Sequence, residues 1–286
     1  MIGVVLAGGS GSRLFPVTRV LSKQLLSIYD KPMIYYPLTT LMFAGIKDFI
    51  IIVDPSQRNN YVNLLGSGDQ WGVNFTFVNQ VNPKGIADCF NLVPVEFRND
   101  SCAVILGDNL FYGMGLGSSL KSVFKKQGAL AFAYEVSNPS EYGVVQLDEN
   151  QKPINIMEKP SAEVGNLAIP GLYFFDQSCY EVIKQIKPSH RGELEITEVL
   201  QAYMLESRLE IYKLARGTAW LDTGTHANLL AAANFVQVIE DRQGLKIGCP
   251  EEVAYRQGFI TSEQLLDLTN KMPEGSYRSY LQRIVS

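Results

Sequence analysis

The chain has 286 residues, of which 46% are hydrophobic and 19% are charged, and its formal net charge is −4. This length and composition are typical of a globular protein with one large domain or two smaller ones, and they exclude a chain that is disordered throughout. The 25 Lys and Arg residues are scattered and form no basic stripe, so nucleic acid is not an expected partner. A small anionic substrate would need a local cluster of donors, because the overall charge repels it mildly.

The four cysteines stand far apart without a Cys-x-x-Cys pair, which argues against a zinc site and favours reduced thiols. The chain opens directly on the strand-like run Ile2–Leu6 without a basic leader. No segment approaches the ~18 consecutive apolar residues of a membrane span. We therefore expect a cytoplasmic protein with no membrane partner.

Short apolar runs alternate with helical patterns over the first 110 residues. Strands rich in Val and Ile are predicted at Ile2–Leu6, Phe49–Val53, Val73–Val78 and Ala103–Leu106. Helices that end at a glycine are predicted over Ile34–Phe43 and Tyr61–Leu65. This alternation predicts an α/β fold with a mainly parallel sheet covered by helices on both faces.

The middle of the chain is less regular and predicts a mixed extension of the sheet. Further strands are expected at Gly143–Leu147, Pro153–Met157 and Leu172–Phe175. A helix is expected beyond Thr225, and a shorter one over Thr261–Leu268. No linker is evident, so we predict a catalytic domain over residues 1–240 and a C-terminal helical extension over residues 241–286, packed on it.

The first predicted strand runs into a glycine-rich loop, Gly8-Gly9-Ser10-Gly11-Ser12-Arg13. Such a turn lets backbone N–H groups approach phosphate oxygens with no Cβ in the way. If a P-loop began at Gly8, its second glycine would fall on Arg13. If a dinucleotide-binding motif began at Gly9, its third glycine would fall on Leu14. Neither motif therefore fits. Arg13 and Lys23 instead supply two cations suited to a polyphosphate.

Two aspartates follow apolar segments of the sequence. Asp108 comes after Ala103–Leu106, where open α/β sheets bind their ligands, and Asp222 occupies a similar place after Trp220 and Leu221. Two carboxylates, completed by water and substrate phosphate, would satisfy Mg²⁺. The residues alone allow a second interpretation, because an Asp is equally suited to a helix cap or a turn.

Eight motifs occur in an order that resembles the sugar-phosphate nucleotidyltransferases. They are Leu6–Thr18, Ser22–Leu26, Tyr29–Met33, Leu106–Asn109, Tyr142–Val145, Glu158–Pro160, Arg191–Thr197 and Trp220–His226. The resemblance spans nearly the whole chain and is closest to members that transfer a thymidylyl group from dTTP to glucose 1-phosphate. It implies a Rossmann-like nucleotidyltransferase fold, a homotetramer, and a Mg²⁺-dependent attack of the sugar phosphate on the α-phosphorus with release of pyrophosphate.

The resemblance also implies a role for individual residues. Nucleotide-binding residues would be Gly8, Gly9, Gly11, Ser12, Arg13, Lys23, Gln24, Gln80 and Gly85. Sugar-phosphate-binding residues would be Asn109, Tyr142, Gly143, Glu158, Lys159, Ile169 and Arg191. Asp108 and Asp222 would hold Mg²⁺, while Arg13, Lys23 and Lys159 would act in catalysis.

The reaction needs no general base, because a phosphate monoester is already anionic at pH 7 with a second pKa near ~6. We therefore interpret His190 as a loop residue and His226 as a residue near a helix start. The segment Pro250–Arg256 resembles one that lines a regulatory nucleotide-sugar site, with Glu252 and Arg256 as candidate contacts.

Three positions differ from the family pattern: Lys84 replaces an aspartate before Gly85, Pro170 replaces a threonine, and Ser27 replaces a proline. The first two bear on the choice of base and of sugar, so UTP or another sugar 1-phosphate is an alternative within the same reaction. An alternative of another class is a non-catalytic regulatory subunit that binds nucleotide sugars. A dehydrogenase is disfavoured by the glycine spacing.

Overall fold

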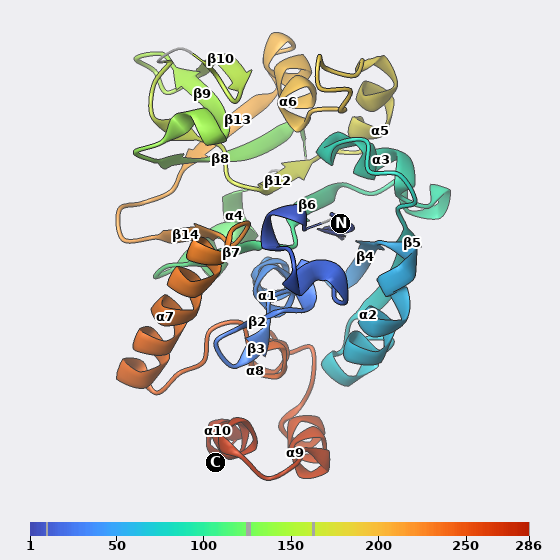
Figure 1. Ribbon diagram of the computed structural model, residues 1–286, viewed down its shortest axis with the longest axis vertical. Coiled ribbons are helices and arrows are strands. Elements are labelled where there is room, and N and C mark those ends of the chain that lie inside the picture. Colours follow the sequence, from blue (N-terminus) through green and yellow to red (C-terminus); the bar gives the residue numbers. More distant parts are fainter. Residues whose placement is uncertain (10, 124–126, 162–163, 286) are drawn as a thin grey trace.

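Ten strands form a central mixed sheet in the order β10-β9-β11-β8-β12-β6-β1-β4-β5, with β13 pairing with β8 (Figure 1). This computed structural model describes residues 1–9, 11–123, 127–161 and 164–285. The predicted α/β architecture with a mixed sheet flanked by helices is confirmed.

The parallel half of the sheet consists of β1 (Ile2–Ala7), β4 (Asp48–Val53), β5 (Asn74–Asn79) and β6 (Cys102–Leu106). The other half consists of β8 (Ala129–Glu135), β9 (Gly143–Leu147), β10 (Pro153–Glu158), β11 (Leu167–Ala168), β12 (Leu172–Phe175) and β13 (Leu209–Lys213). Its pairs are antiparallel except that β13 runs parallel to β8. Two small antiparallel pairs lie outside the sheet: β2 (Ser27–Ile28) with β3 (Lys31–Pro32), and β7 (Asn109–Tyr112) with β14 (Ala219–Asp222).

The helices cover the sheet from both sides. They are α1 (Tyr35–Phe43), α2 (Arg58–Leu65), α3 (Cys89–Leu92), α4 (Leu116–Val123), α5 (Cys179–Val182), α6 (Ile196–Leu205), α7 (His226–Gln243), α8 (Pro250–Arg256), α9 (Ser262–Lys271) and α10 (Ser276–Val285). Residues of α1, α2 and α8 to α10 contribute to one hydrophobic cluster, residues of α3, α5 and α6 contribute to a second, and residues of α7 contribute to a third. Figure 1 shows α9 and α10 at the end of the molecule opposite β9 and β10.

The strands that carry the core are apolar on both faces. In β1, Val5 and Ala7 join the cluster beneath α1, whereas Ile2 and Val4 join the cluster beneath α3 and α6. Side chains alternate between the faces of a strand, so a strand covered on both sides must be apolar at every position. Each fully buried aliphatic side chain contributes about 1.5–3 kcal/mol to this packing, which holds the strand ends in fixed positions.

The strands predicted from the sequence are all present, and so are the helices predicted over Ile34–Phe43, Tyr61–Leu65, the residues beyond Thr225, and Thr261–Leu268. Helix α7 begins at His226, and Thr225 caps it by accepting a hydrogen bond from the backbone N–H of Asn228 at 3.2 Å. The division at residue 240 stays a prediction, and α7 continues to Gln243.

Several elements were not predicted from the sequence, among them β7, β8, β13, β14 and α6. The strand β8 is rich in alanine, which has low intrinsic strand propensity, and only its burial between neighbouring strands makes the segment extended. None of the helices within the described part of the chain is long and apolar enough to cross a membrane.

Candidate active site

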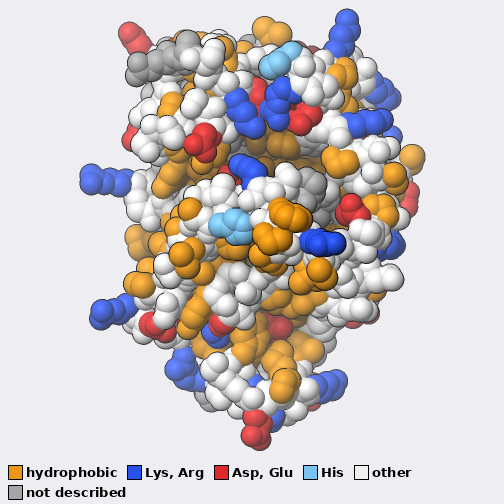
Figure 2. Space-filling view, viewed as in Figure 1, with side chains coloured by type: hydrophobic (Ala, Val, Ile, Leu, Met, Phe, Trp, Pro, Cys, Tyr) orange, Lys and Arg blue, Asp and Glu red, His pale blue; other side chains and the backbone are white. Residues whose placement is uncertain are grey.

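A cavity of about 540 Å³ opens beyond the C-terminal end of β6, between the parallel half of the sheet and the strands β9 and β10. Figure 2 shows a hollow near the middle of this face, with Lys and Arg side chains beside it. The lining residues are Arg13, Ile86, Leu106, Asp108, Asn109, Ser140, Glu141, Tyr142, Gly143, Glu158, Lys159, Ile169, Gly171, Tyr173, Ile196, Thr197, Trp220 and Asp222. Nine of them were predicted as site residues, although they are spread over more than 200 positions of the sequence.

Asp108 and Asp222 lie together because backbone hydrogen bonds join their segments. The pairing of β7 with β14 sets Asp222 opposite Asn109. Beyond β14, the backbone N–H and the hydroxyl of Thr223 both donate to the carbonyl oxygen of Asp108, at 3.1 and 2.8 Å. Burial and the negative charge of Asp108 raise the pKa of Asp222, while Lys23, the N–H of Gly224 and Arg13 act in the opposite direction.

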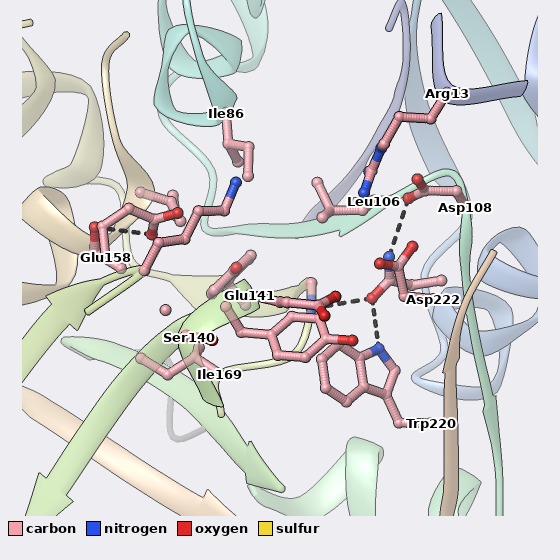
Figure 3. A pocket seen from close by; sticks show the side chains of 18 residues that line it. Arg13, Ile86, Leu106, Asp108, Ser140, Glu141, Glu158, Ile169, Trp220 and Asp222 are labelled. Carbon is pink, nitrogen blue, oxygen red and sulfur yellow. Dashed lines mark hydrogen bonds between the residues drawn. The ribbon is translucent and has the colours of Figure 1, made fainter. Parts of the chain in front are cut away.

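The two carboxylates fit a magnesium ion. The described residues include no group of three or more His, Cys, Asp or Glu side chains that could hold a metal by themselves. Mg²⁺, however, is commonly held by one or two carboxylates, with water and substrate phosphate completing its coordination. Asp108 and Asp222 line a cavity with room for those ligands, on the same wall as Arg13 (Figure 3).

Lys23 contacts Asp108 directly. Its Nζ forms an ion pair with Oδ2 of Asp108, and the two side chains are only 14% and 11% exposed. Lys23 lies in the 3₁₀ turn Lys23–Leu25, and it does not line the cavity itself. Of the predicted cations for the triphosphate, Arg13 therefore faces the cavity, whereas Lys23 is held by a carboxylate.

The glycines of the loop differ in their surroundings. A Cβ on Gly8 would lie 2.5 Å from Oε1 of Gln80, so a side chain at this position would displace the Gln80 carboxamide. Gly11 has φ +62°, and its carbonyl accepts a hydrogen bond from the Thr18 hydroxyl at 2.9 Å. A Cβ on Gly9 would meet nothing within 4 Å. Ser12 begins the 3₁₀ turn Ser12–Leu14, and Ser10 lies outside the described residues.

Gln24 and Gln80, the predicted base-reading residues, are both buried. The Gln24 carboxamide oxygen accepts a hydrogen bond from the Ser22 hydroxyl at 2.7 Å. Gly85 has φ +103°, and a Cβ there would lie 2.4 Å from the carbonyl oxygen of Leu194. The packing of Leu194 therefore requires a glycine at this position, whatever its contact with a base.

The far side of the cavity is built from β9 and β10. Their register sets Glu158 opposite Gly143, and the backbone N–H of Ile169 donates to the Gly143 carbonyl at 2.7 Å. Lys159 follows β10 in a left-handed conformation with φ +42°, and its N–H donates to the Tyr142 carbonyl at 3.0 Å. This side thus gathers the predicted sugar-phosphate residues Tyr142, Gly143, Glu158, Lys159 and Ile169.

Asn109 joins the two sides through its carboxamide. Its Nδ2 donates to Oδ1 of Asp108 at 3.0 Å, and its Oδ1 accepts from Nε1 of Trp220 at 2.6 Å and from the backbone of Gly171 at 3.2 Å. The Trp220 ring meets the Tyr142 ring edge to face, with 4.9 Å between centroids. Figure 3 shows Trp220 below Asp222.

Arg191 does not line the main cavity. It lies on an adjoining cavity of about 210 Å³, which shares Glu158, Lys159 and Thr197 with the main one. Burial and the charge of Glu195 raise the pKa of Glu158, while Lys159, Arg191 and the Thr197 hydroxyl act in the opposite direction.

The family model for nucleotidyl transferases matches residues 2–238 of this chain. The chain belongs to the nucleotidyl transferase family. This nucleotidyltransferase is 50% identical over 285 residues to the glucose-1-phosphate thymidylyltransferase of Mycobacterium tuberculosis, covering 100% of this chain and 99% of that protein. It is 45% identical over 286 residues to the enzyme of the same name from Neisseria meningitidis, with the same coverage.

Solved structures of nucleotidyltransferases are also similar to this chain. A candidate glucose-1-phosphate thymidylyltransferase from Bacillus anthracis, in complex with sucrose, has a TM-score of 0.75 and 36% identity, covering 82% of this chain and 95% of that one. A UDP-glucose pyrophosphorylase in complex with UDP-glucose has a TM-score of 0.73 and 27% identity, covering 83% and 98%. The predicted nucleotidyltransferase fold is confirmed.

The predicted regulatory residues of the nucleotidyltransferase lie elsewhere. Glu252 lines a second cavity of about 530 Å³, together with residues of α1 and α4. Arg256 does not line this cavity, but its Nε pairs with Oε1 of Glu252 at 2.6 Å. The two residues therefore form one polar unit away from the main cavity.

Sequence reasoning gave no role to half of the residues that line the main cavity of the nucleotidyltransferase. Ile86, Leu106, Tyr173 and Ile196 are apolar, and nothing in a single sequence separates such residues from the core. Trp220 carried a usable signal, because it stands two positions before a predicted metal ligand. Glu195 stands within the motif Arg191–Thr197, but nothing in that motif indicates that its carboxylate is buried.

Proposed function

We propose that this nucleotidyltransferase transfers a thymidylyl group from dTTP to glucose 1-phosphate, giving dTDP-glucose and pyrophosphate. The observation that carries the proposal is the single cavity with Arg13, Asp108 and Asp222 on one wall and Glu158 and Lys159 on the other. Relatives named for this activity, 43–50% identical over nearly the whole chain, support it.

The nucleotide would lie against the loop Gly8–Arg13 and Lys23. Backbone N–H groups of the loop and the side chains of Arg13 and Lys23 would bind the triphosphate and offset the charge that develops on the leaving pyrophosphate. Asp108 and Asp222 would hold Mg²⁺, which would supply further positive charge to the phosphates. Lys23 would then exchange Asp108 for phosphate oxygens.

The sugar phosphate would enter from the opposite side. Lys159 and Arg191 would hold its phosphate, and Asn109, Tyr142, Gly143, Glu158 and Ile169 would contact the sugar. Because the attacking oxygen is already anionic, these residues act by bringing two anions together in line rather than by removing a proton.

The choice of base rests on Gln24 and Gln80, whose carboxamides present a donor and an acceptor to a pyrimidine edge. A matrix of nucleoside triphosphates against sugar 1-phosphates, scored by pyrophosphate release, tests the proposal. The highest kcat/KM is expected for dTTP with glucose 1-phosphate, and EDTA should abolish the signal. A higher value with UTP or another sugar would redirect the assignment. Binding of nucleotide sugars without turnover in any combination would indicate a regulatory subunit.

As a second part of this proposal, the cavity beside Glu252 binds a nucleotide sugar that regulates a cytoplasmic homotetramer. Its volume, its position outside the main cavity and the Glu252–Arg256 pair support this. Arg256→Ala should relieve inhibition by nucleotide sugars while it leaves uninhibited turnover nearly unchanged. An equally inhibited variant would count against the site, and light scattering would test the tetramer.

A further inference from the structure

Arg191 lies in a tight turn just before α6. The backbone N–H of Gly192 donates to the Ser189 carbonyl at 2.8 Å, and the N–H of Ser189 donates to the Glu193 carbonyl at 2.8 Å. Gly192 has φ +75°, a conformation that glycine adopts without strain. We call residues 189–195 the arm. Its backbone bonds fix where the turn lies, but they do not fix the long side chain of Arg191.

Three carboxylates contact the Arg191 guanidinium. The distances are 3.0 Å to Glu193, 3.6 Å to Glu195 and 3.7 Å to Glu158. Their exposure differs more than their distance, because the side chain of Glu193 is 41% exposed and that of Glu195 is 6% exposed. Exposed ion pairs hold a geometry weakly, whereas a buried carboxylate has no water to replace its partners. Glu195 is therefore the fixed point among the three.

A single oxygen of Glu195 serves both ends of the turn. Its Oε1 accepts a hydrogen bond from the Ser189 hydroxyl at 2.8 Å and lies 3.6 Å from Nη1 of Arg191. The Ser189 hydroxyl oxygen in turn accepts from the backbone N–H of Arg191 at 3.2 Å. Glu195 occupies the N-cap position of α6, yet its side chain accepts no N–H of that helix. Helix capping therefore does not account for the buried charge.

We propose that Glu195 is a positioning residue, whose buried carboxylate anchors Ser189 and Arg191 so that the guanidinium is presented to the phosphate of a sugar 1-phosphate. The inference rests on the proposed function. Glu195 lines only the adjoining cavity, whereas its neighbours Ile196 and Thr197 line the main one. Its side chain is 6% exposed and its Oε1 already contacts Ser189 and Arg191, so Glu195 acts through Arg191 and does not itself contact the substrate.

Glu195 has a second, separable effect on the site. Its charge faces Glu158 and favours the protonated form of that group, alongside burial, while Lys159, Arg191 and the hydroxyl of Thr197 favour the charged form. The charge of Glu158 also acts on the hydroxyl of Tyr173, whose pKa is raised by burial and by this charge. Removal of the Glu195 charge should therefore lower the pKa of Glu158, which an effect on folding alone would not do.

Glu195→Gln and Glu193→Gln form a matched pair for the test, because each removes one carboxylate charge from the same arginine. For Glu195→Gln we expect KM for glucose 1-phosphate to rise about tenfold, with KM for dTTP within about twofold of the wild type. For Glu193→Gln we expect both constants within about twofold. After correction for the ionisation of glucose 1-phosphate itself, with a second pKa near ~6, the acid limb of kcat/KM for this substrate should move to lower pH in Glu195→Gln only.

Two outcomes would overturn the inference. One is a Glu195→Gln enzyme that matches Glu193→Gln in KM and in pH profile. The other is a parallel loss for dTTP and glucose 1-phosphate with an unmoved acid limb, which would indicate a structural role. If Glu195→Gln fails to fold, Glu195→Asp keeps the charge but shortens the reach. It should then raise KM for glucose 1-phosphate while the acid limb stays in place, and an unchanged KM would equally overturn the inference.

The wild-type enzyme separates this inference from the proposed function. Absence of pyrophosphate release by the wild type with every substrate pair would reject the proposed function alone. Calorimetric titration of the wild type and both variants with glucose 1-phosphate would then decide the role of Glu195. Weaker binding by Glu195→Gln than by Glu193→Gln would support the inference, and equal binding would overturn it.

Discussion

Lys23 and Arg191, two cations just outside the main cavity, are held in contrasting ways. Behind the strand-end wall, which consists of Arg13, Asp108 and Asp222, the Lys23–Asp108 pair is nearly buried, and backbone hydrogen bonds join the segments of the two aspartates. On the arm, Arg191 is about one-third exposed and shares three carboxylates. The same chemistry, a cation beside a carboxylate, is therefore rigid on one side and adjustable on the other.

This difference in burial determines how much stability is lost when one residue of an ion pair is removed. Removing one partner of a buried pair leaves an uncompensated charge, at a cost of about 3–5 kcal/mol, whereas an exposed pair contributes about 0–1 kcal/mol. We infer that the two aspartates are held in place before the triphosphate binds, whereas the Arg191 side chain depends on Glu195 for its position.

The largest expected effect is that of Asp108→Asn on the strand-end wall. It removes one of the two proposed magnesium ligands, so kcat should fall at least about a hundredfold. It also breaks the nearly buried Lys23–Asp108 pair and leaves Asp222 as the carboxylate near Lys23, so the free energy of unfolding should fall by about 1–3 kcal/mol. Turnover assays and urea unfolding measure the two effects separately. Full stability in the variant would show that the buried pair is not fixed.

Asp176→Asn is the control for that change. Burial opposes ionisation of Asp176, but hydrogen bonds from Ser178, the N–H of Gly128 and Tyr203 prevail and lower its pKa. A carboxyl pKa below its unfolded value stabilises the fold above about pH 4, and this stabilisation is lost as the pH falls through the lowered pKa. Asp176→Asn should therefore reduce stability at neutral pH and retain turnover. Equal losses of turnover in both variants would show that the loss in Asp108→Asn is not specific to a metal ligand.

The sequence predicted the strand-end wall better than the arm, and the reason is physical. Asp108 follows an apolar strand, and strand ends converge at one edge of a parallel sheet, so its location could be inferred from the pattern. The partnership of Lys23 with Asp108 could not, because it depends on how a loop of 3₁₀ turns folds back on the sheet. The pattern also gave no sign that Arg191 lies on a separate cavity or that Glu195 is buried beneath it.

The smallest expected effects are those of one glycine substitution in the glycine-rich loop and one in the arm. Gly8→Ala would press its Cβ against Oε1 of the buried Gln80, 2.5 Å away, so we expect the Gln80 carboxamide to move and KM for dTTP to rise about threefold to tenfold. In Gly192→Ala the new Cβ would meet nothing within 4 Å, and only the positive φ opposes it, at about 1 kcal/mol of stability. Substrate kinetics and urea unfolding of both variants provide the comparison. A larger rise in KM for Gly192→Ala than for Gly8→Ala would contradict this expectation, because the arm would then be the less tolerant of a displaced side chain.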